Sequence, residues 1–192
     1  MKDWFQSEGG AQLVEFAVSL PLLVVFVVGI FDFSSAFTLK QKLTNIARDA
    51  ARAAAADPAN DLQSGGIPGS VSDAFQTIDN YMIDSRMNDC GVASSGPPSG
   101  LTWKFTGGAN GCTPPGLTIT VNRGYAFPMT GAVAPGVTCQ SQALNGQTAM
   151  IGTCVSIQYA YPWKFGRAAS LLGRNTSLPT QVSAVAVALN EN

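Results

Sequence analysis

The sequence of 192 residues contains no histidine, and this absence removes whole classes of catalytic and metal sites. Without imidazole there is no Ser-His-Asp or Cys-His catalytic unit, no histidine-ligated metal and no imidazole switch near neutral pH. Charged residues make up only 12% of the chain, whereas an ordinary soluble domain has about 25%. The 11 basic and 12 acidic residues nearly cancel, so no basic field favours nucleic acid as a partner.

Other kinds of chemical site are also missing from the sequence. The four cysteines form no C-x-x-C motif, which argues against zinc or thioredoxin-like chemistry. Asp57 and Asp61 lack the spacing of a calcium loop, and no candidate nucleophile has a base beside it. We therefore predict no catalytic residue, no metal, no cofactor and no enzyme activity. A carboxylate-based hydrolase is the open alternative, although no carboxylates are recognisably paired.

What the sequence does contain is a long apolar run near its start. Residues 16–31 carry no charge, and the stretch Gly9–Phe31 is interrupted only by Glu15. Crossing the hydrocarbon core of a bilayer takes about 20 helical residues, so this stretch is long enough to span it. A removable secretory signal is the alternative, but the run is too long and no small-residue cleavage site follows it. The pattern favours a retained membrane anchor.

The presence of a carboxylate, Glu15, in this apolar run needs an explanation. A carboxylate near the bilayer interior costs about 2.5 to 3.5 kcal/mol on insertion scales and by default suggests a function. A second interpretation places Glu15 at the headgroup level, where it would only mark the start of the span.

Residues 9–16, GGAQLVEF, resemble the processing site of pilins and pseudopilins, where a prepilin peptidase cuts after glycine and glutamate is fifth in the mature chain. The Glu15-Phe16 pair, the apolar run and the alanine- and arginine-rich stretch 41–55 are similar to TadE-like pseudopilins of tight-adherence (Flp) pilus systems. The leader departs from the family because it is not basic. The resemblance covers about a quarter of the chain and implies cleavage between Gly10 and Ala11.

The same resemblance implies the partners and the role of the acid. They are prepilin peptidase, other pilin or pseudopilin subunits, the pilus assembly machinery of the inner membrane and the lipid bilayer. The carboxylate of Glu15, followed by Phe16, would pair with the free amino terminus of a neighbouring subunit. A buried charge is tolerable when it is paired in this way.

Beyond the run, apolar positions recur at spacings of three and four, which predicts one helix over residues 11–56 that ends before Asp57-Pro58. Residues 1–10 would be the leader and residues 57–69 a linker. A capping box of Ser70 and Asp73 predicts a second amphipathic helix that stops near Cys90-Gly91. Arg48 and Arg52 need no role beyond a solvated helix face.

Alternation with period two follows the second helix and predicts about four strands. The strand signals are Leu101 to Phe105, Leu117 to Val121, Val155 to Tyr161 and Gln181 to Leu189. The predicted fold class is therefore α+β and pilin-like: a long membrane and spine helix, a second helix and an antiparallel sheet within residues 70–192.

The four cysteines, Cys90, Cys112, Cys139 and Cys154, all follow the apolar run. Their even number and long spacings suggest two structural disulfides in an oxidising compartment. Three connectivities are possible, and we favour Cys90–Cys112 with Cys139–Cys154 because these close the shorter loops. Four buried thiols are the alternative.

By the positive-inside rule, the charges near the run predict that the large part of the chain after it stays in the cytoplasm. Lys40, Lys42 and two arginines follow the run, whereas only Lys2 precedes it. Long domains translocate despite such charge, so the cysteines and the resemblance carry more weight. They predict a single-pass protein of the bacterial inner membrane whose residues 70–192 lie outside the cytoplasm. A monomeric, membrane-anchored domain for ligand binding or adhesion is the competing function.

Overall fold

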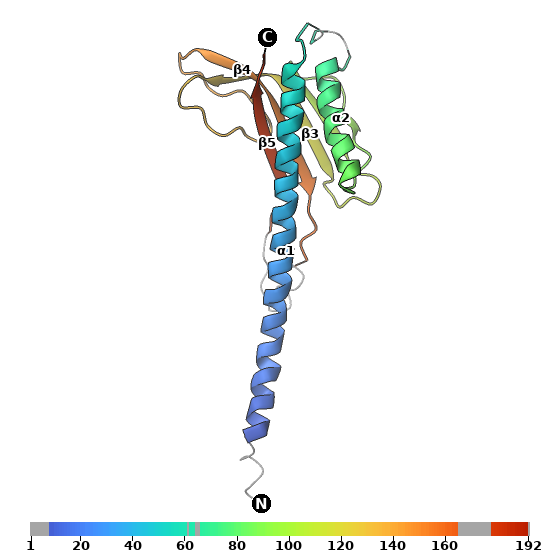
Figure 1. The fold of residues 1–192 in the computed structure, drawn as a ribbon, viewed down its shortest axis with the longest axis vertical. Coiled ribbons are helices and arrows are strands. Elements are labelled where there is room, and N and C mark those ends of the chain that lie inside the picture. The colour runs from blue at the N-terminus through green and yellow to red at the C-terminus, as the bar shows by residue number, and fades with distance from the viewer. Residues whose placement is uncertain (1–7, 61, 64–65, 165–177, 192) are drawn as a thin grey trace, which may run out of the picture. The chain divides into compact units, whose positions relative to one another are not determined.

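The computed structural model of the chain describes residues 8–60, 62–63, 66–164 and 178–191. The fold is α+β: a long N-terminal helix, a second helix and an antiparallel sheet of five strands (Figure 1). The elements are α1 (Glu8–Ala56), α2 (Gly69–Asp84), β1 (Ala93–Ser94), β2 (Thr102–Gly107), β3 (Leu117–Pro128), β4 (Ala149–Ala160) and β5 (Gln181–Leu189).

The chain divides into two compact units. Residues 1–37 and 162–179 form the first, which we call the helix unit. Residues 38–161 and 180–192 form the second, which we call the sheet unit. Helix α1 contributes its first part to one unit and its last part to the other.

Helix α1 is continuous over 49 residues, with Pro21 inside it, and ends at Ala56 as predicted. The end follows from Asp57-Pro58, because proline disfavours the helical conformation of the residue before it. Within the sheet unit, the face of α1 that packs into the core is alanine-rich, and Leu43, Ile46, Ala47, Ala50 and Ala54 are fully buried. Arg48 and Arg52 lie on the exposed face.

Helix α2 differs from the prediction at both ends. Its N-cap is Pro68 and no side chain caps it. Ser70 lies inside the helix, buried in the core, so the predicted capping box is wrong. The helix stops at Asp84 rather than near Cys90-Gly91 because Arg86 adopts a left-handed φ of 53°.

A Schellman motif follows at that helix end. The amide of Met87 donates to the carbonyl of Met82 at 2.8 Å, and the amide of Arg86 donates to that of Ile83 at 3.0 Å.

The sheet has the strand order β1-β2-β3-β4-β5, so each strand pairs with its neighbours in sequence. The fifth strand beyond the predicted four is β1, which pairs only two residues with β2. In the centre of the sheet, Ile119 of β3 lies opposite Ile157 of β4, and Val155 of β4 lies opposite Ala186 of β5. A bulge in β3 shifts the register between Asn122 and Tyr125.

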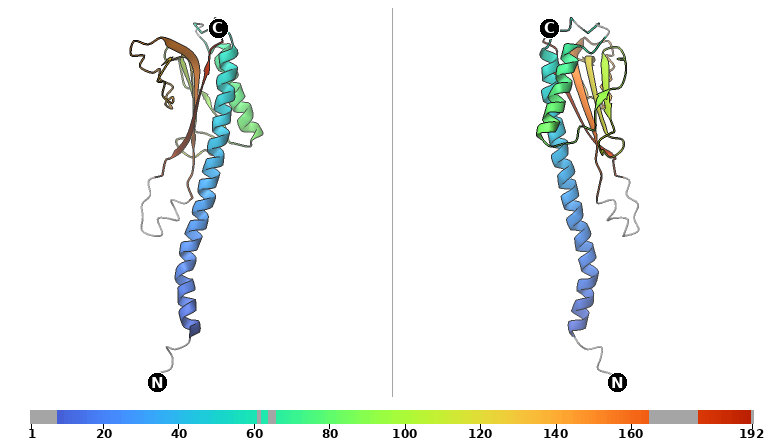
Figure 2. Two further views of the ribbon diagram at one scale, coloured as in Figure 1. Left: turned by 60° about the vertical axis from the view of Figure 1, so that its left-hand side comes forward. Right: turned by 90° about the vertical axis from the view of Figure 1, so that its right-hand side faces the viewer.

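One face of the sheet carries both α2 and the last part of α1, which lie side by side (Figure 2). The predicted apolar face of α2 is buried at Val71, Ala74, Ile78 and Met82. Phe75 stacks on Phe105 of β2 with ring centroids 4.6 Å apart. The core of the sheet unit is therefore a layer of small and branched side chains between two helices and one sheet.

Candidate functional site

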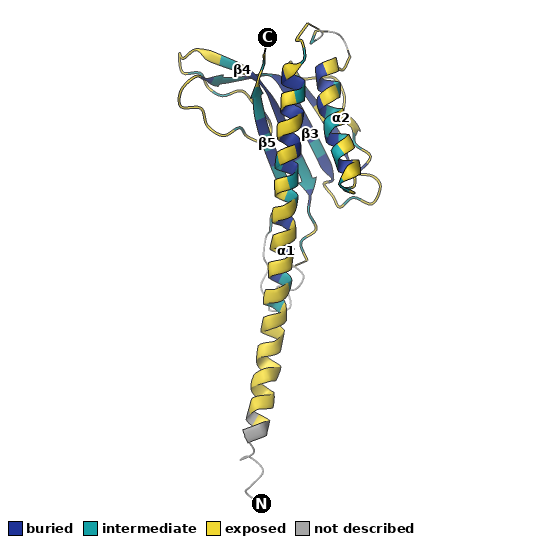
Figure 3. Ribbon diagram, viewed as in Figure 1, coloured by how far each residue is buried: buried dark blue, intermediate teal, exposed yellow. Residues whose placement is uncertain are grey.

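The apolar part of α1 lies in the helix unit and is exposed on every face from Gln12 to Val24 (Figure 3). Leu13, Phe16 and Leu23 expose 71%, 64% and 61% of their surfaces. By length and composition α1 is one helix that could cross a membrane. An apolar helix exposed all round suits lipid or helix partners rather than water. The helix is thus compatible with a single-pass membrane anchor.

The predicted cleavage site lies at the start of α1. Because the helix begins at Glu8, Gly10 and Ala11 belong to its first turn. The first four amide groups of a helix have no intrahelical acceptor, so this is the least stabilised part of the helix. The first seven residues of the predicted leader lie outside the described residues.

Glu15 and Phe16 follow one turn after Ala11, and both are exposed. No hydrogen bond or ion pair joins Glu15 to any residue that the structure describes. The residue four positions after it, Ser19, donates its hydroxyl to the carbonyl of Phe16 at 3.2 Å. The Glu15 carboxylate is therefore available to another chain.

The sheet unit contains a buried polar cluster that the sequence reasoning missed, centred on Arg123 of β3. Arg123 exposes only 1% of its surface. One guanidinium nitrogen donates to the Thr153 hydroxyl at 2.7 Å and to the Asn190 side chain at 3.2 Å, and the other donates to the Asp57 carbonyl at 2.8 Å. We call Arg123, Asp57, Thr153 and Asn190 the Arg123 cluster.

The Arg123 cluster joins the end of α1 to the strands. Asp57 directly follows α1, Thr153 lies in β4 and Asn190 follows β5. Asn190 returns a hydrogen bond to the carbonyl of Arg123 at 3.1 Å. A cation at the C-terminus of a helix also interacts favourably with the helix dipole. The cluster therefore fixes the end of α1 to β3 and β4.

Two disulfides use all four cysteines. Cys90 pairs with Cys112 and Cys139 with Cys154, the connectivity that closes the shorter loops. The first disulfide joins residues 22 positions apart and the second joins residues 15 positions apart. Loops of this length are each worth about 3 kcal/mol in the chain-entropy account. The disulfides fasten the long connections of the sheet unit to its core.

Tyr159 lies beside the first disulfide at the end of β4. Its hydroxyl donates to the carbonyl of Asn88 at 3.1 Å. Burial raises the pKa of Tyr159, and the nearby charge of Asp89 raises it further. The fold therefore favours the neutral phenol.

This shift predicts a loss of stability in alkali. The raised pKa means that the folded chain keeps a proton that the unfolded chain loses at about pH 10. The free energy of unfolding should fall as the pH rises from about 10 through the folded pKa of Tyr159. Urea unfolding of the chain and of Tyr159→Phe at several alkaline pH values tests this. An identical pH dependence in both proteins would contradict it.

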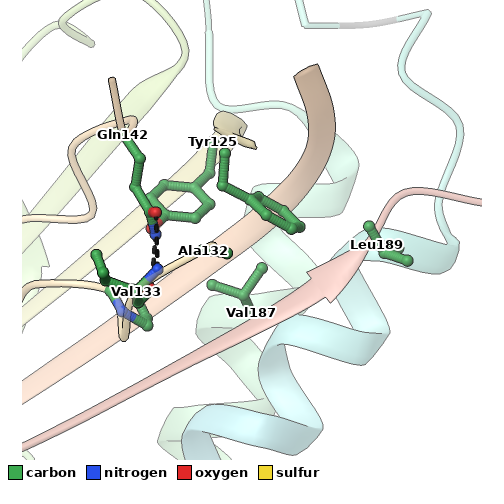
Figure 4. A pocket seen from close by; sticks show the side chains of 8 residues that line it. Tyr125, Ala132, Val133, Gln142, Val187 and Leu189 are labelled. Carbon is green, nitrogen blue, oxygen red and sulfur yellow. Dashed lines mark hydrogen bonds between the residues drawn. The ribbon is translucent and has the colours of Figure 1, made fainter. Parts of the chain in front are cut away.

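An open depression of about 220 Å³ lies beside the second disulfide. Its lining is mainly apolar: Tyr125, Phe127, Ala132, Val133, Pro135, Gln142, Val187 and Leu189. Gln142 points between Tyr125 and Val133 (Figure 4), donating to the Tyr125 hydroxyl and the Val133 carbonyl at 2.7 Å each. No charged residue occurs between Arg123 and Lys164. The depression suits a small neutral group and offers no acid–base pair.

Within the described residues, no group of three or more cysteine and acidic side chains could hold a metal ion.

Comparison with known protein families gives one match. Residues 10–52 match the family of TadE-like proteins. The matched residues all belong to α1 and include Gly10, Glu15 and Phe16, while α2 and the sheet lie beyond the match. No curated protein and no solved structure matches the chain. The similarity to TadE-like proteins therefore rests on the N-terminal helix.

Proposed function

We propose that the chain is a minor pseudopilin of a tight-adherence (Flp) pilus, cleaved by prepilin peptidase after Gly10 and incorporated through α1. The observation that carries this proposal is the exposed apolar helix with Glu15 as the fifth residue after Gly10. An unpaired carboxylate on such a helix is costly in lipid and tolerable once a counter-charge covers it.

The counter-charge is the amino group that cleavage creates on Ala11. Glu15 lies four positions after Ala11, which is about 6 Å along a helix axis. A neighbouring copy displaced by about one turn brings its amino terminus level with this carboxylate. Processing and assembly are thereby linked, because an uncleaved chain has no charged amine at that position. The peptidase, the neighbouring pilin subunits and the inner-membrane assembly machinery are the partners in this proposal.

The proposed location of the sheet unit is extracytoplasmic. Both disulfides lie in that unit, and disulfides form and persist in oxidising compartments such as the periplasm. The basic residues after the apolar run oppose this orientation but do not prevent translocation of a long domain.

The cleavage proposal is tested by the mass of the protein purified from membranes that contain the peptidase. We expect a mature chain that starts at Ala11. Gly10→Ala should leave the full-length mass because it changes the residue at the cut. Gly9→Ala is the matched control, since it makes the same change one position earlier and should be processed normally. A Gly10→Ala chain of mature mass would overturn the assignment of the cleavage site.

A membrane-anchored binding module is the second candidate, and the depression lined by Tyr125, Val133 and Val187 favours it. In that case Glu15 has no partner and the leader stays on the chain. Sequencing the N-terminus of the same preparation separates the two functions: a start at Met1 supports the binding module, and a start at Ala11 supports the pseudopilin.

A further inference from the structure

The helix unit contains a second segment besides α1. Residues 162–179, which connect β4 to β5, belong to the same compact unit as residues 1–37. The described contact between the two is aromatic: the rings of Phe33 and Trp163 lie 5.2 Å apart, tilted by 56°. Phe33 comes two residues after Phe31, where the apolar run ends. Trp163 therefore lies against α1 at the boundary of its membrane-spanning stretch.

Trp163 is held in this position by its own connection. Its indole N–H donates to the carbonyl of Pro179, so the two described ends of residues 162–179 are joined. One stripe of α1 at the same level is buried, at Gly29, Asp32 and Ala36, while Phe33 remains 50% exposed. A tryptophan fixed beside an exposed phenylalanine forms a broad aromatic surface.

The connection that carries Trp163 contains basic residues and no acidic one, and the acidic residue of α1 at this level, Asp32, is buried. Lys164 directly follows Trp163 and is exposed. The sequence contains no acidic residue between Asp89 and Glu191. Tryptophan is enriched at the membrane–water interface, and lysine extends its ammonium group to the anionic surface while its stem covers apolar area. Aromatic surface and cation thus occur together at the end of the span.

We infer that Trp163 and Lys164 form an interfacial anchor that holds the β4–β5 connection on the membrane, with anionic phospholipid headgroups as the ligand. The ring of Trp163, resting on Phe33, lies at the level of the lipid carbonyls, and Lys164 contacts phosphate. This inference rests on the membrane insertion of α1 in the proposed function. It adds a second point at which the chain meets the bilayer.

The test uses the full chain in vesicles of phosphatidylcholine, with and without phosphatidylglycerol. Subtracting the fluorescence of Trp163→Phe from that of the unmodified chain isolates Trp163 from the other two tryptophans. We expect a nitroxide label on the lipid headgroup to quench Trp163 more strongly than a label at the end of the acyl chain. Retention of the chain after a carbonate wash reports insertion of α1 separately.

The contribution of the lysine is tested with Lys164→Gln. Removing one cation from an anionic surface should lower the ratio of membrane-bound to free Trp163 by about five-fold. The loss should occur on anionic vesicles and not on neutral ones. Lys104→Gln is the matched control, because Lys104 is an equally exposed lysine on β2. An unchanged ratio in Lys164→Gln would overturn the headgroup contact.

Two further outcomes would overturn the anchor while leaving membrane insertion intact. In the first, the chain resists the carbonate wash but aqueous acrylamide quenches Trp163 and neither lipid label does. In the second, neither acrylamide nor the labels reach Trp163, which means that protein covers it. A chain that the wash removes would instead contradict the membrane insertion itself.

Discussion

Arg123→Met should destabilise the sheet unit by about 3 kcal/mol or more, because a buried acceptor left without its donor costs about 1 to 3 kcal/mol and several lose theirs together. The guanidinium group supplies hydrogen bonds to Asp57, Thr153 and Asn190 at once. Methionine fills much of the volume but leaves these acceptors without their donor. A loss of this size is a large part of the 5 to 15 kcal/mol that typically separates folded from unfolded domains.

The measurement is urea unfolding of the full chain in detergent, followed by the fluorescence of Trp103, which is 2% exposed in the core of the sheet unit. Lys104→Met is the matched control: it removes the same charge from an exposed site and should change stability by less than about 0.5 kcal/mol. Arg123→Lys keeps the charge but loses the planar fork, so we expect an intermediate effect. Equal stability of the two methionine variants would show that the Arg123 cluster contributes nothing.

Glu15→Gln should abolish or severely impair piliation while the chain still inserts into the membrane. The amide keeps the shape of the side chain but offers no negative charge to the amino terminus of a neighbouring subunit. Insertion should be preserved because the variant no longer carries an acid that costs about 2.5 to 3.5 kcal/mol near the bilayer interior. Counting pili on cells that produce the variant, beside its amount in washed membranes, gives both readouts.

Glu8→Gln is the control for this experiment. It removes a carboxylate about two helical turns before Glu15. The proposed processing after Gly10 would discard residue 8, so the mature chain would be identical to that of the unmodified protein. Normal piliation in Glu15→Gln would contradict the pairing role. Weaker membrane retention with normal processing would instead favour the interpretation that Glu15 marks the edge of the span.

The elements that the sequence predicted well are those with local signals. The end of α1 depends on Asp57-Pro58, and the bounds of β5 match the apolar stretch Gln181 to Leu189. The alternating pattern places Ile119 and Ile157 on the buried side, where both are found. In each case residues that are close in sequence determine the conformation, so the sequence of that segment is enough to predict it.

The features that the sequence did not predict depend on distant residues or on unusual backbone. Helix α2 ends because Arg86 adopts a left-handed conformation. Glycine is the usual residue at such a position, so an arginine there does not predict the end of a helix. Strand β1 exists only through its two pairings with β2. The sequence analysis assigned no role to Arg123, and only its partners Asp57, Thr153 and Asn190, far away in sequence, explain its burial.

The candidate site divides in the same way. Gly10, Ala11, Glu15 and Phe16 are predictions from spacing and resemblance, which a sequence can supply because these residues form a short continuous segment. The Trp163–Phe33 contact could not be predicted in this way, since it joins residues on two segments that only the fold brings together. The depression beside Tyr125 likewise needs side chains from β3, β5 and the loop between β3 and β4.

The order of the strands has a consequence for how this chain reaches its native state. Each strand pairs with its sequence neighbour, so the sheet can grow by adding one strand at a time in chain order. The alanine face of α1 packs in the same core cluster as Ala184 and Ala186 of β5, from the last part of the chain. A chain delivered from its N-terminus therefore leaves part of that face uncovered until β5 arrives. Packing of the sheet unit is completed only once β5 is available.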